Sequence, residues 1–312
     1  MIVFSDPADI PDGFGPSVVA IGKFDGVHTG HRRVLERARA DAERLGAKVV
    51  AVTFDRNPLA TIRPELCPNE LVSLGQKIDL LAGTGLDAAV VLRFDEEMAH
   101  VSAEDFVRDI LVRDLGAVVV LLGTDFRFGY RGAGDPQLLE RMGAELGFTT
   151  DVVDDVVVAG EERRVSSSWI RELLSVGDVA HAAQLLGRPH RVEGEVVHGL
   201  KRGRELGFPT ANLSPQSQGD VPADGVYAGW LVTPDGVHHQ AAISVGVNPT
   251  FDDVDVRQVE AYVLDETELD LYGQHVVVEF VDRIRGMVAF QGIPALIEQM
   301  TDDVTRTRAI LS

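Results

Sequence analysis

The stretch GKFDGVHTGH, residues 22–31, decides how the first half of this chain folds. It follows the apolar run SVVAI (residues 17–21), whose β-branched residues are typical of a buried strand in a parallel sheet. Apolar residues then recur at helical spacing between Val34 and Leu45, with charged residues on the other faces. The stretch is therefore predicted to be a strand-to-helix turn.

This turn has the composition of an anion-binding site. A helix N-terminus presents free backbone N–H groups, and glycines allow a phosphate to approach the backbone closely. His28 and His31 stand at the mouth of the predicted helix, where two imidazoles could bind a metal or donate hydrogen bonds to a polyphosphate. A metal needs further ligands, and the single cysteine, Cys67, lies in a proline-flanked loop, so we favour phosphate. In the plainer alternative His28 only fills a turn and His31 only caps a helix. It is disfavoured because the two histidines share one strand-to-helix turn with Gly26, Gly30 and Asp25.

The composition limits the classes of partner. With 312 residues the chain is long enough for two domains, and its 29 basic and 49 acidic side chains give a net charge of −20, which repels DNA and RNA. The first fifteen residues lack the basic start of a signal peptide, and no apolar run reaches the roughly 20 residues that span a bilayer. A single cysteine fits a reducing cytoplasm. We expect a cytoplasmic protein with small-molecule substrates, no nucleic acid and no membrane, and we leave open whether identical chains associate.

The first half has the alternating pattern of a parallel sheet. Further apolar runs occupy residues 48–54, 87–94, 117–123 and 151–158. Helical patterns lie between them, at residues 73–81 and from Ser102, a capping residue, to Leu111. This alternation predicts an α/β domain with a doubly wound sheet, in which ligands bind beyond the carboxyl ends of the strands.

Polar motifs follow several of these predicted strands. The loop GTDFRFG (residues 123–129) offers Asp125 to a nucleotide or its metal and Phe128 to a flat ring, although packing under the loop is an equal alternative for Phe126 and Phe128. In VSSSWIR (residues 165–171), three hydroxyls and a helix N-terminus, with Arg171 one turn in, form an anion site. The alternative for this second motif is a plain serine cap on a surface helix.

The spacing of apolar residues changes from a helical to a strand-like pattern in the second half. A helical pattern from Val179 to Leu186 is broken by GRPH (residues 187–190), which predicts a boundary between domains 1–186 and 187–312. Short strand-like runs then alternate with Gly, Pro and Asp turns, and a helical pattern spans residues 294–311. We therefore predict a small antiparallel β-barrel followed by a C-terminal helix. The predicted strands of this barrel are residues 192–197, 225–232, 241–247, 259–264 and 276–281.

Four motifs carry a family resemblance. The opening stretch resembles the HxGH signature of nucleotidyltransferases, in the form found in bifunctional prokaryotic FAD synthetases (riboflavin kinase/FMN adenylyltransferases). Residues 123–129 and 165–171 resemble that family's G-x-D/N-F-x-F-G and I-S-S-T-x-I-R motifs, and residues 194–213 resemble the riboflavin kinase segment that ends in G-F-P-T-A-N. The resemblance implies a Rossmann-like nucleotidyltransferase domain followed by a riboflavin kinase barrel.

The resemblance implies two reactions. Riboflavin and ATP give FMN and ADP in the second domain, and FMN and ATP give FAD and pyrophosphate in the first. His28 and His31 are then expected to hold the α- and β-phosphates of ATP, and Phe106 and Phe128 to pack against the isoalloxazine. The remaining residues expected to bind the nucleotide in the first domain are Gly22, Phe24, Asp25, Gly30, Asp125, Ser166, Ser167, Ser168 and Arg171.

The kinase site is expected on the barrel. The resemblance aligns Glu260 with the glutamate that accepts the proton of the riboflavin 5′-hydroxyl, although an exposed strand carboxylate is the plain alternative. Thr210 and Asn212 are two residues apart, hence on one face of a strand, and offer oxygen ligands for a Mg²⁺ that bridges ATP phosphates. The residues expected to bind phosphate in the glycine-rich loop are Lys201, Gly203 and Arg204.

One motif departs from the family. The family usually has T-F-D-P-H-P where residues 53–58 read TFDRNP, so Asn57 replaces a histidine. Two alternatives therefore stand beside the bifunctional enzyme. One is a riboflavin kinase with impaired adenylylation, and the other is a non-catalytic regulator that binds a flavin or a nucleotide.

Overall fold

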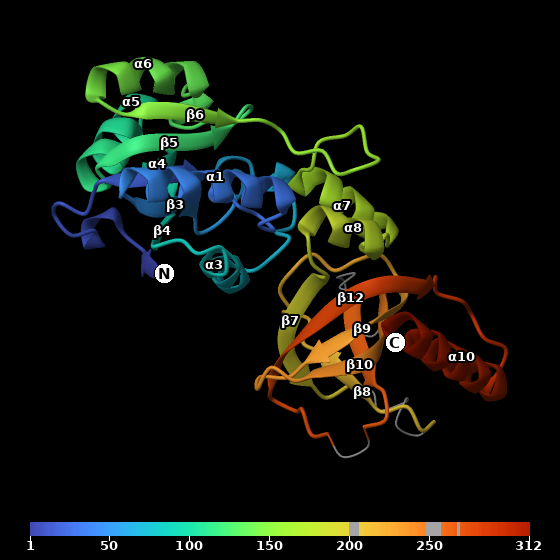
Figure 1. Cartoon of the computed structure of the whole chain (residues 1–312). Helices are drawn as coiled ribbons and strands as arrows, with labels where there is room; N and C mark the ends of the chain where they lie inside the picture. The colour runs from blue at the N-terminus through green and yellow to red at the C-terminus, as the bar shows by residue number, and fades with distance from the viewer. Residues whose placement is uncertain (200–205, 248–256, 267–268) are drawn as a thin grey trace. The chain divides into compact units, whose positions relative to one another are not determined.

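A computed structural model describes residues 1–199, 206–247, 257–266 and 269–312 of the chain (Figure 1). The chain divides into two compact units, Met1–Ser166 and Ser167–Ser312, which are described one at a time. Helices α7 (Ser167–Val176) and α8 (Val179–Leu186) lie between this division and the sequence-based boundary after residue 186, which stays a prediction. Helix α8 packs against strands β7 (His190–Val197) and β12 (His275–Arg285) of the second unit.

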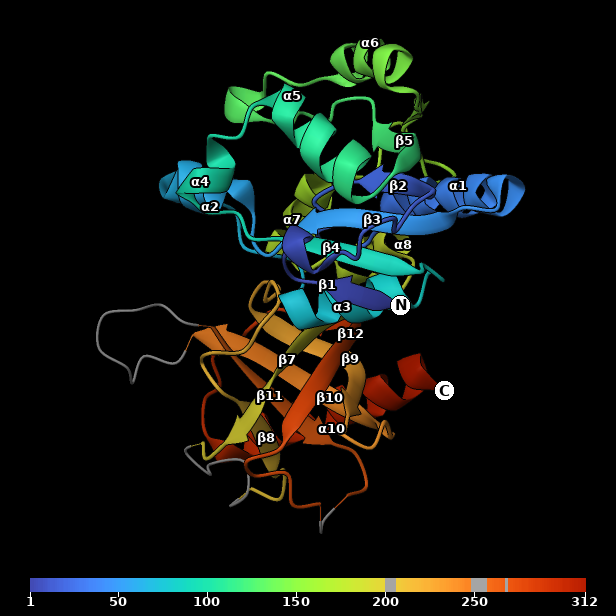
Figure 2. The ribbon, with the colours of Figure 1, turned by 90° about the vertical axis from the view of Figure 1, so that its left-hand side faces the viewer.

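The first unit is a six-stranded parallel sheet, as the alternating pattern predicts. Its strand order is β1-β4-β3-β2-β5-β6, and β5, β2, β3, β4 and β1 follow one another down Figure 2. Its main elements are β1 (Ile2–Phe4), β2 (Ser17–Ile21), α1 (Thr29–Leu45), β3 (Lys48–Phe54), α2 (Pro58–Ile62), α3 (Leu74–Ala82), β4 (Ala88–Leu92), α4 (Glu96–Ala99), α5 (Ala103–Asp105), a π-helical segment (Phe106–Asp114), β5 (Ala117–Gly123), α6 (Pro136–Leu146) and β6 (Thr149–Val153).

The sheet is covered on both faces because its strands are apolar throughout. Val18 and Ala20 of β2 belong to the core under α1 and α3, whereas Val19 and Ile21 belong to the core that contains the π-helical segment and α6. Alternate residues of one strand thus serve opposite layers. Because both faces of each strand are buried, the strands appear in the sequence as continuous apolar runs.

Two local expectations differ from the structure. The strand predicted at residues 151–158 is β6 (Thr149–Val153), and Val157 instead forms an isolated antiparallel bridge with Arg164. The helix predicted from Ser102 is indeed capped by that residue, but it becomes π-helical from Phe106 onward. Strand β1 and helix α6 were not predicted. In the case of β1, a three-residue edge strand has too few residues to show a hydrophobic period.

The second unit contains the closed antiparallel barrel that the second half predicts. The strand order is β10-β11-β8-β7-β12-β9, so each strand has a partner on both sides. Its strands and final helix are β7 (His190–Val197), β8 (Thr210–Leu213), β9 (Gly225–Val232), β10 (His238–Val247), β11 (Arg257–Val263), β12 (His275–Arg285) and α10 (Ile293–Leu311).

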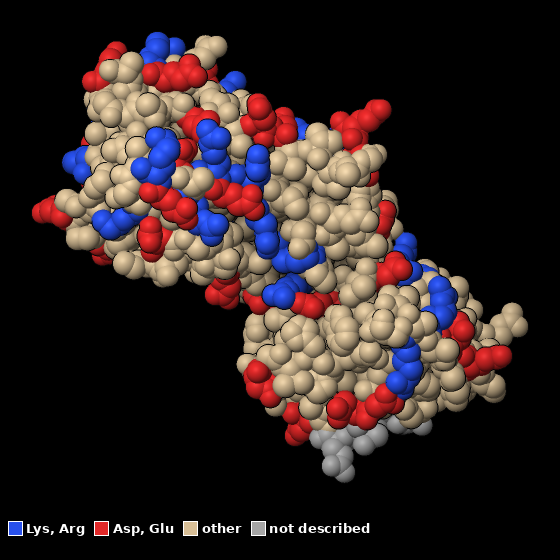
Figure 3. Space-filling model, viewed as in Figure 1, with Lys and Arg blue, Asp and Glu red and all other residues tan. Residues whose placement is uncertain are grey.

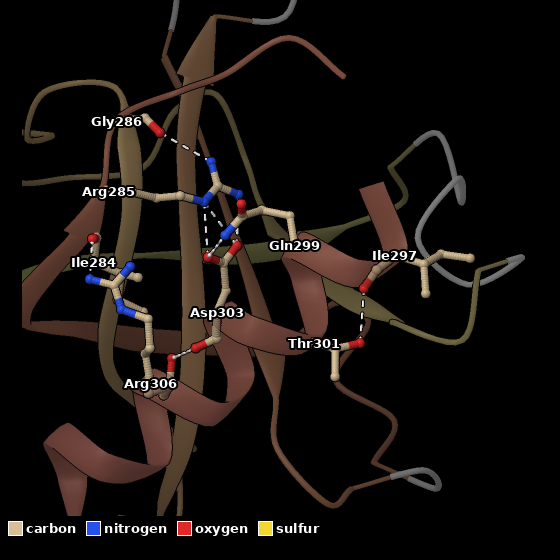
Figure 4. A network of polar contacts seen from close by, with 9 residues as sticks. Ile284, Arg285, Gly286, Ile297, Gln299, Thr301, Asp303 and Arg306 are labelled. Atoms are coloured by element: carbon tan, nitrogen blue, oxygen red, sulfur yellow. Dashed lines mark hydrogen bonds and ion pairs between the residues drawn. The ribbon is translucent and has the colours of Figure 1, made fainter. Parts of the chain in front are cut away.

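Helix α10 is fixed to the barrel by a buried ion pair. Arg285, at the end of β12, donates to both carboxylate oxygens of Asp303 on α10, with a shortest distance of 2.6 Å (Figure 4). Gln299 donates to the same carboxylate at 3.1 Å, and Arg306 donates to the carbonyl of Ile284 at 2.7 Å. The Asp303 side chain is only 5% exposed, so its charge depends on these donors.

The surface carries charges of both signs. Lys and Arg lie among Asp and Glu on the visible face of the first unit in Figure 3 rather than in a separate patch. Exposed pairs such as Arg37 with Asp151, at 3.0 Å, account for part of this mixing. Within the described residues, no helix is long and apolar enough to cross a membrane.

We expect Arg285→Ala to lower the free energy of unfolding by about 3 to 5 kcal/mol, because it leaves the buried Asp303 carboxylate without its cation. Denaturant unfolding of the full chain measures this loss. Arg308→Ala is the matched control, since Arg308 also lies on α10 but forms a solvent-exposed pair with Asp265 at 2.6 Å. Equal effects of the two substitutions would contradict the role of burial.

Candidate active sites

The HxGH turn lies at the point where the sheet reverses its direction of winding. The chain passes from β2 to its neighbour β3 and later returns to β5 on the other side of β2. In doubly wound sheets, this switch point is where ligands bind, beyond the carboxyl ends of the strands. The turn that follows β2 and the loop Gly123–Gly129 that follows β5 therefore leave the same edge of the sheet from neighbouring strands.

The backbone of the turn has an uncommon conformation. Phe24 and Val27 have φ angles of +48° and +40°, in the left-handed region that a β-branched residue such as Val27 rarely adopts. Strain of this kind costs about 1–3 kcal/mol per residue and persists only where the surroundings enforce it. Both side chains are buried in the core, at 1% and 0% exposure, and the N–H of Val27 donates to the carbonyl of Phe24 at 3.1 Å. Core packing thus holds the turn in a fixed shape.

The two histidines of the turn are stacked on one another. Their ring centroids are 3.6 Å apart with 14° between the planes. His28 is the N-cap of α1, and its Nδ1 accepts the backbone N–H of His31 at 3.3 Å. Because Nδ1 is the acceptor, the proton of a neutral His28 ring is on Nε2. His28 therefore caps the helix through Nδ1 and carries its ring N–H on Nε2.

Glycines leave the space for this arrangement. A Cβ added to Gly30 would lie 3.1 Å from Cε1 of His28, and one added to Gly22 would lie 3.1 Å from the ring of Phe24. The carbonyl of Val165 is 3.9 Å from the same added atom at Gly30. The start of the VSSSWIR motif thus runs beside the HxGH turn within the first unit.

His31 is held in its uncharged form. Burial lowers its pKa well below the usual 6.5, and the nearby His28 and Lys77 lower it further. Its buried Nδ1 has no hydrogen-bond partner among the described residues. Buried polar atoms are normally paired, so this atom is one that a bound ligand or a water could satisfy.

Asp25 and Asn57 both make structural contacts near the turn. Asp25 accepts the backbone N–H of Leu71 at 2.9 Å, which ties the turn to the segment before α3. Asn57 is the N-cap of α2, and its side chain accepts the N–H of Leu59 at 3.1 Å. The residue that replaces the family's histidine thus begins a helix, a role for which Asn is well suited.

Asp125 belongs to an exposed ion-pair cluster. Its carboxylate is 2.6 Å from the guanidinium of Arg164, which also contacts Asp155 at 3.2 Å. Asp125 raises the pKa of the Arg164 guanidinium by a hydrogen bond and by its charge. This cluster connects the loop after β5 to the residues that lead into the VSSSWIR motif.

Phe106 and Phe128 are core residues in this structure. Their rings are 3% and 5% exposed, and the ring centroids are 5.6 Å apart. A Cβ added to Gly134 would lie 2.6 Å from the Phe128 ring, so the loop closes tightly over it. Packing under the loop is therefore observed, and contact with an isoalloxazine stays a prediction. Phe126 is only partly buried against the same core.

The serine motif spans the division between the two units. Ser166 is the last residue of the first unit, and Ser167, Ser168 and Arg171 lie in the first turns of α7 in the second. The predicted helix N-terminus is present. The contribution of these residues to a phosphate site stays a prediction.

On the barrel, three predicted site residues occupy neighbouring positions. Strands β8 and β11 pair so that Glu260 lies opposite Asn212 and Tyr262 opposite Thr210. Opposed residues of antiparallel strands point to the same face, and alternate residues share it. The Thr210 hydroxyl donates to Glu260 at 3.4 Å, and the Asn212 amide donates to the Thr210 hydroxyl at 3.2 Å. The three side chains thus form one polar cluster.

Burial makes Glu260 a stronger base than an exposed carboxylate. Its pKa is raised above the usual value by burial, while the hydrogen bond from Thr210 acts in the opposite direction. A carboxylate with a raised pKa accepts a proton more readily, provided that the pH keeps it ionised. The side chain is half-buried rather than exposed on its strand.

An open pocket lies beside this cluster. It has a cavity volume of about 80 Å³, is partly open to solvent, and is lined by Thr210 and Asn212 together with Gly199 and Tyr272. A Cβ added to Gly199 would lie 2.4 Å from Oδ1 of Asn212, so only glycine allows this approach. The predicted phosphate-loop residues Lys201, Gly203 and Arg204 lie outside the described residues.

The donors at this pocket suit Mg²⁺ better than a transition metal. Thr210 and Asn212 supply oxygen atoms, the ligand type that Mg²⁺ prefers when phosphates and waters complete its shell. Among the residues that the structure describes, no cluster of three His, Cys, Asp or Glu side chains could hold a metal ion. The residues present therefore fit a magnesium ion that arrives with a nucleotide.

Sequence reasoning missed two residues near the HxGH turn. Lys77 of α3 is only 5% exposed, and its ammonium donates to the carbonyl of Phe54 at 2.9 Å. Arg164 joins Asp125 to the serine motif. One sequence signal could have indicated the burial of Lys77: it lies within the helical pattern at residues 73–81, next to the apolar Ile78.

The fold and the two residue sets define a two-domain, nucleotide-binding enzyme. The FAD synthetase family model matches residues 12–169, and the riboflavin kinase family model matches residues 186–311. The chain belongs to the family of bifunctional riboflavin kinase/FMN adenylyltransferases, the prokaryotic FAD synthetases. The resemblance found in the sequence is confirmed, in the expected domain order.

Individual relatives match almost the whole chain. A bifunctional riboflavin kinase/FMN adenylyltransferase of Escherichia coli is 34% identical, over 93% of this chain and 91% of the relative. Its counterpart in Pseudomonas fluorescens is 36% identical, over 94% of this chain and 92% of the relative. A solved structure, described as a macrolide-efflux protein from Streptococcus pneumoniae, has a TM-score of 0.88 at 30% identity and covers 98% of each chain. This last likeness shows that both units of the fold occur together in a solved protein.

We expect His28→Ala to destabilise the first unit by about 1 kcal/mol through loss of the N-cap alone, and His28→Asn to keep that contribution because Asn caps helices well. Thermal or denaturant unfolding of the full chain measures both. If both variants lost equal stability, the cap would not be the contribution that His28 makes.

Proposed function

We propose that this chain makes FAD in two steps. The barrel unit transfers the γ-phosphate of ATP to riboflavin, and the parallel-sheet unit transfers the adenylyl group of a second ATP to the resulting FMN. The observation that carries the proposal is that each of the two family matches falls on a unit with its own cluster of polar site residues. We further propose that the protein acts in the cytoplasm, which the single cysteine supports.

In the adenylyl transfer, an oxygen of the FMN phosphate attacks the α-phosphorus of ATP while the bond to the pyrophosphate oxygen breaks. No covalent enzyme intermediate is needed, so the protein contributes position and charge stabilisation. We assign the Nε2–H of His28 and the ring of His31 to the α- and β-phosphates, which the helix N-terminus also faces. The remaining nucleotide contacts are proposed for the residues named from the sequence.

In the kinase reaction, Glu260 accepts the proton of the riboflavin 5′-hydroxyl as its oxygen attacks the γ-phosphorus and ADP leaves. The raised pKa of Glu260 supports this role, as does its place beside Thr210 and Asn212. We propose that those two side chains hold Mg²⁺, which when bound neutralises charge on the ATP phosphates. The strand pairing that aligns the three residues supports this assignment, because it keeps the proposed base beside the two proposed Mg²⁺ ligands.

We expect Glu260→Gln to reduce FMN formation by about 10²- to 10⁴-fold, the usual contribution of a general base, while added FMN is still converted to FAD. In the unaltered protein, the kinase rate should decrease as the pH is lowered, because Glu260 becomes protonated. This decrease should begin at a higher pH than it would for an exposed glutamate, since burial raises the pKa of Glu260. Chromatography of flavins formed from riboflavin, ATP and Mg²⁺ measures both. Loss of both activities, or of neither, would contradict the role assigned to Glu260.

We expect His28→Asn, in which the helix cap is kept, to lose FAD formation from FMN by about 10²-fold or more while riboflavin phosphorylation continues. The same chromatographic assay, with FMN supplied, measures the loss. A variant with normal folding and normal FAD formation would exclude His28 from the phosphate site.

The replacement of the family's histidine by Asn57 is the reason to consider one alternative function, a riboflavin kinase with impaired adenylylation. The unaltered protein decides between them in the same assay: accumulation of FMN without FAD would support the kinase alone. The absence of both products would support a binding regulator. The observed capping of α2 by Asn57 supports the bifunctional enzyme, because it gives this residue a structural reason to differ from the family.

A further inference from the structure

The polar cluster on the barrel contains an amide that can face its surroundings in two ways. Asn212 of β8 is buried, and its side chain ends in an oxygen that accepts hydrogen bonds and a nitrogen that only donates them. A half-turn about the last bond of the side chain exchanges these two atoms. Only the oxygen can bind Mg²⁺, so the orientation of this amide decides whether Asn212 can serve as a metal ligand.

Hydrogen bonds on both sides of the amide select one orientation. Nδ2 of Asn212 donates to the hydroxyl and to the carbonyl of Thr210, at 3.2 Å in each case. Oδ1 accepts a hydrogen bond from Nε2 of Gln258 at 3.4 Å. Gln258 lies on β11, two residues before Glu260, and Glu260 is opposite Asn212 in the pairing of β8 with β11 (Figure 2). Gln258 is therefore a diagonal neighbour of Asn212, within reach of its long side chain.

Gly199 leaves space beside the amide oxygen. A Cβ added to Gly199 would lie 2.4 Å from Oδ1 of Asn212 and 2.7 Å from Nδ2, so a larger residue would fill the approach to this amide. Gly199 and Asn212 both line the open pocket. An amide oxygen has two lone pairs, and the hydrogen bond from Gln258 uses one of them. The second lone pair can bind a cation from this pocket.

We propose that Gln258 is a positioning residue of the kinase metal site: its N–H holds the Asn212 oxygen in the orientation that binds Mg²⁺ and the Asn212 nitrogen toward Thr210. The same series of donors continues from Thr210 to Glu260, so it also directs the Thr210 hydroxyl to the proposed base. The proposal rests on the kinase activity and the Mg²⁺ site proposed above. Gln258 lies outside the four motifs that carry the family resemblance.

The substitution Gln258→Glu separates orientation from charge. A carboxylate of the same size only accepts hydrogen bonds, so it should bind Nδ2 of Asn212 and turn the amide around. We expect the Mg²⁺ concentration that gives half-maximal riboflavin phosphorylation to increase about 10- to 100-fold, the usual effect of removing a group that orients a metal ligand. Charge alone predicts the opposite, because an added carboxylate attracts Mg²⁺.

Gln240→Glu is the matched control for Gln258→Glu. Gln240 is another half-buried barrel glutamine, and its Nε2 donates to the carbonyl of Leu311 at the same distance, 3.4 Å. It has no place in the proposed metal site, so this variant should keep the Mg²⁺ dependence of the unaltered chain. Formation of FAD from FMN should be unchanged in both variants, because both substitutions lie on the barrel.

Calorimetric titration of the full chain with MgCl₂, in the presence of saturating ADP, measures the metal affinity without turnover. Gln258→Glu should weaken this affinity by the same factor, and Gln258→Met, which removes the donor without adding a charge, should also weaken it and serves if Gln258→Glu does not fold. In a chain that already carries Asn212→Ala, Gln258→Glu should cause no further loss, whereas a purely structural residue would cause the same loss in both backgrounds.

Three results would overturn the proposal: unchanged or tighter Mg²⁺ binding in Gln258→Glu, an equal loss in the Asn212→Ala background, or no binding of Mg²⁺ by the unaltered chain with ADP. The failure of the proposed function has a different signature. If the unaltered chain does not phosphorylate riboflavin, the kinase assignment fails, and the MgCl₂ titration still decides whether Gln258 orients Asn212.

Discussion

The proposed adenylylation site depends on the burial of Phe24 and Val27 in the turn after β2. Each has a left-handed backbone, which on its own would be unstable for a non-glycine residue. Their side chains belong to the core formed with α1 and α3, so the packing energy of that layer opposes the strain. Because the turn cannot relax, His28 is brought to the N-cap of α1 and stacked on His31. The chemistry of the turn is thus fixed by the hydrophobic layer beneath it.

The barrel site is built without such strain. Thr210, Asn212 and Glu260 lie on regular paired strands, and the register of β8 and β11 alone places them together. A closed barrel gives each of these strands a second partner, which prevents the register from slipping. A base that must remain close to a hydroxyl group benefits from this rigidity, because a displacement of about 1 Å can cost two orders of magnitude in rate.

Much of this arrangement could be predicted from the sequence where the determining pattern is local. The apolar runs predict the strands, and the spacing of Thr210 and Asn212 predicts their common face, because a strand repeats every two residues. The environment of Lys77 could not be predicted, since its partners Asp25, Asp55 and Glu70 come from three separate segments. The burial of Phe128 could not be predicted either. It depends on contacts with Gly134 and Phe106, and neither a helical nor a strand period relates those two positions to Phe128.

Burial shifts a pKa at each of the two sites, in opposite directions, and at both it disfavours the charged form of the side chain. It raises the pKa of the Glu260 carboxyl and lowers the pKa of the His31 ring, because in both cases the charged form is the one that loses hydration. In the proposed kinase role the useful form of Glu260 is the ionised base, and in the proposed adenylylation role the useful form of His31 is the neutral ring. Acid removes both forms. It protonates Glu260 at a higher pH than an exposed glutamate, and it protonates His31 only at a pH well below the usual 6.5.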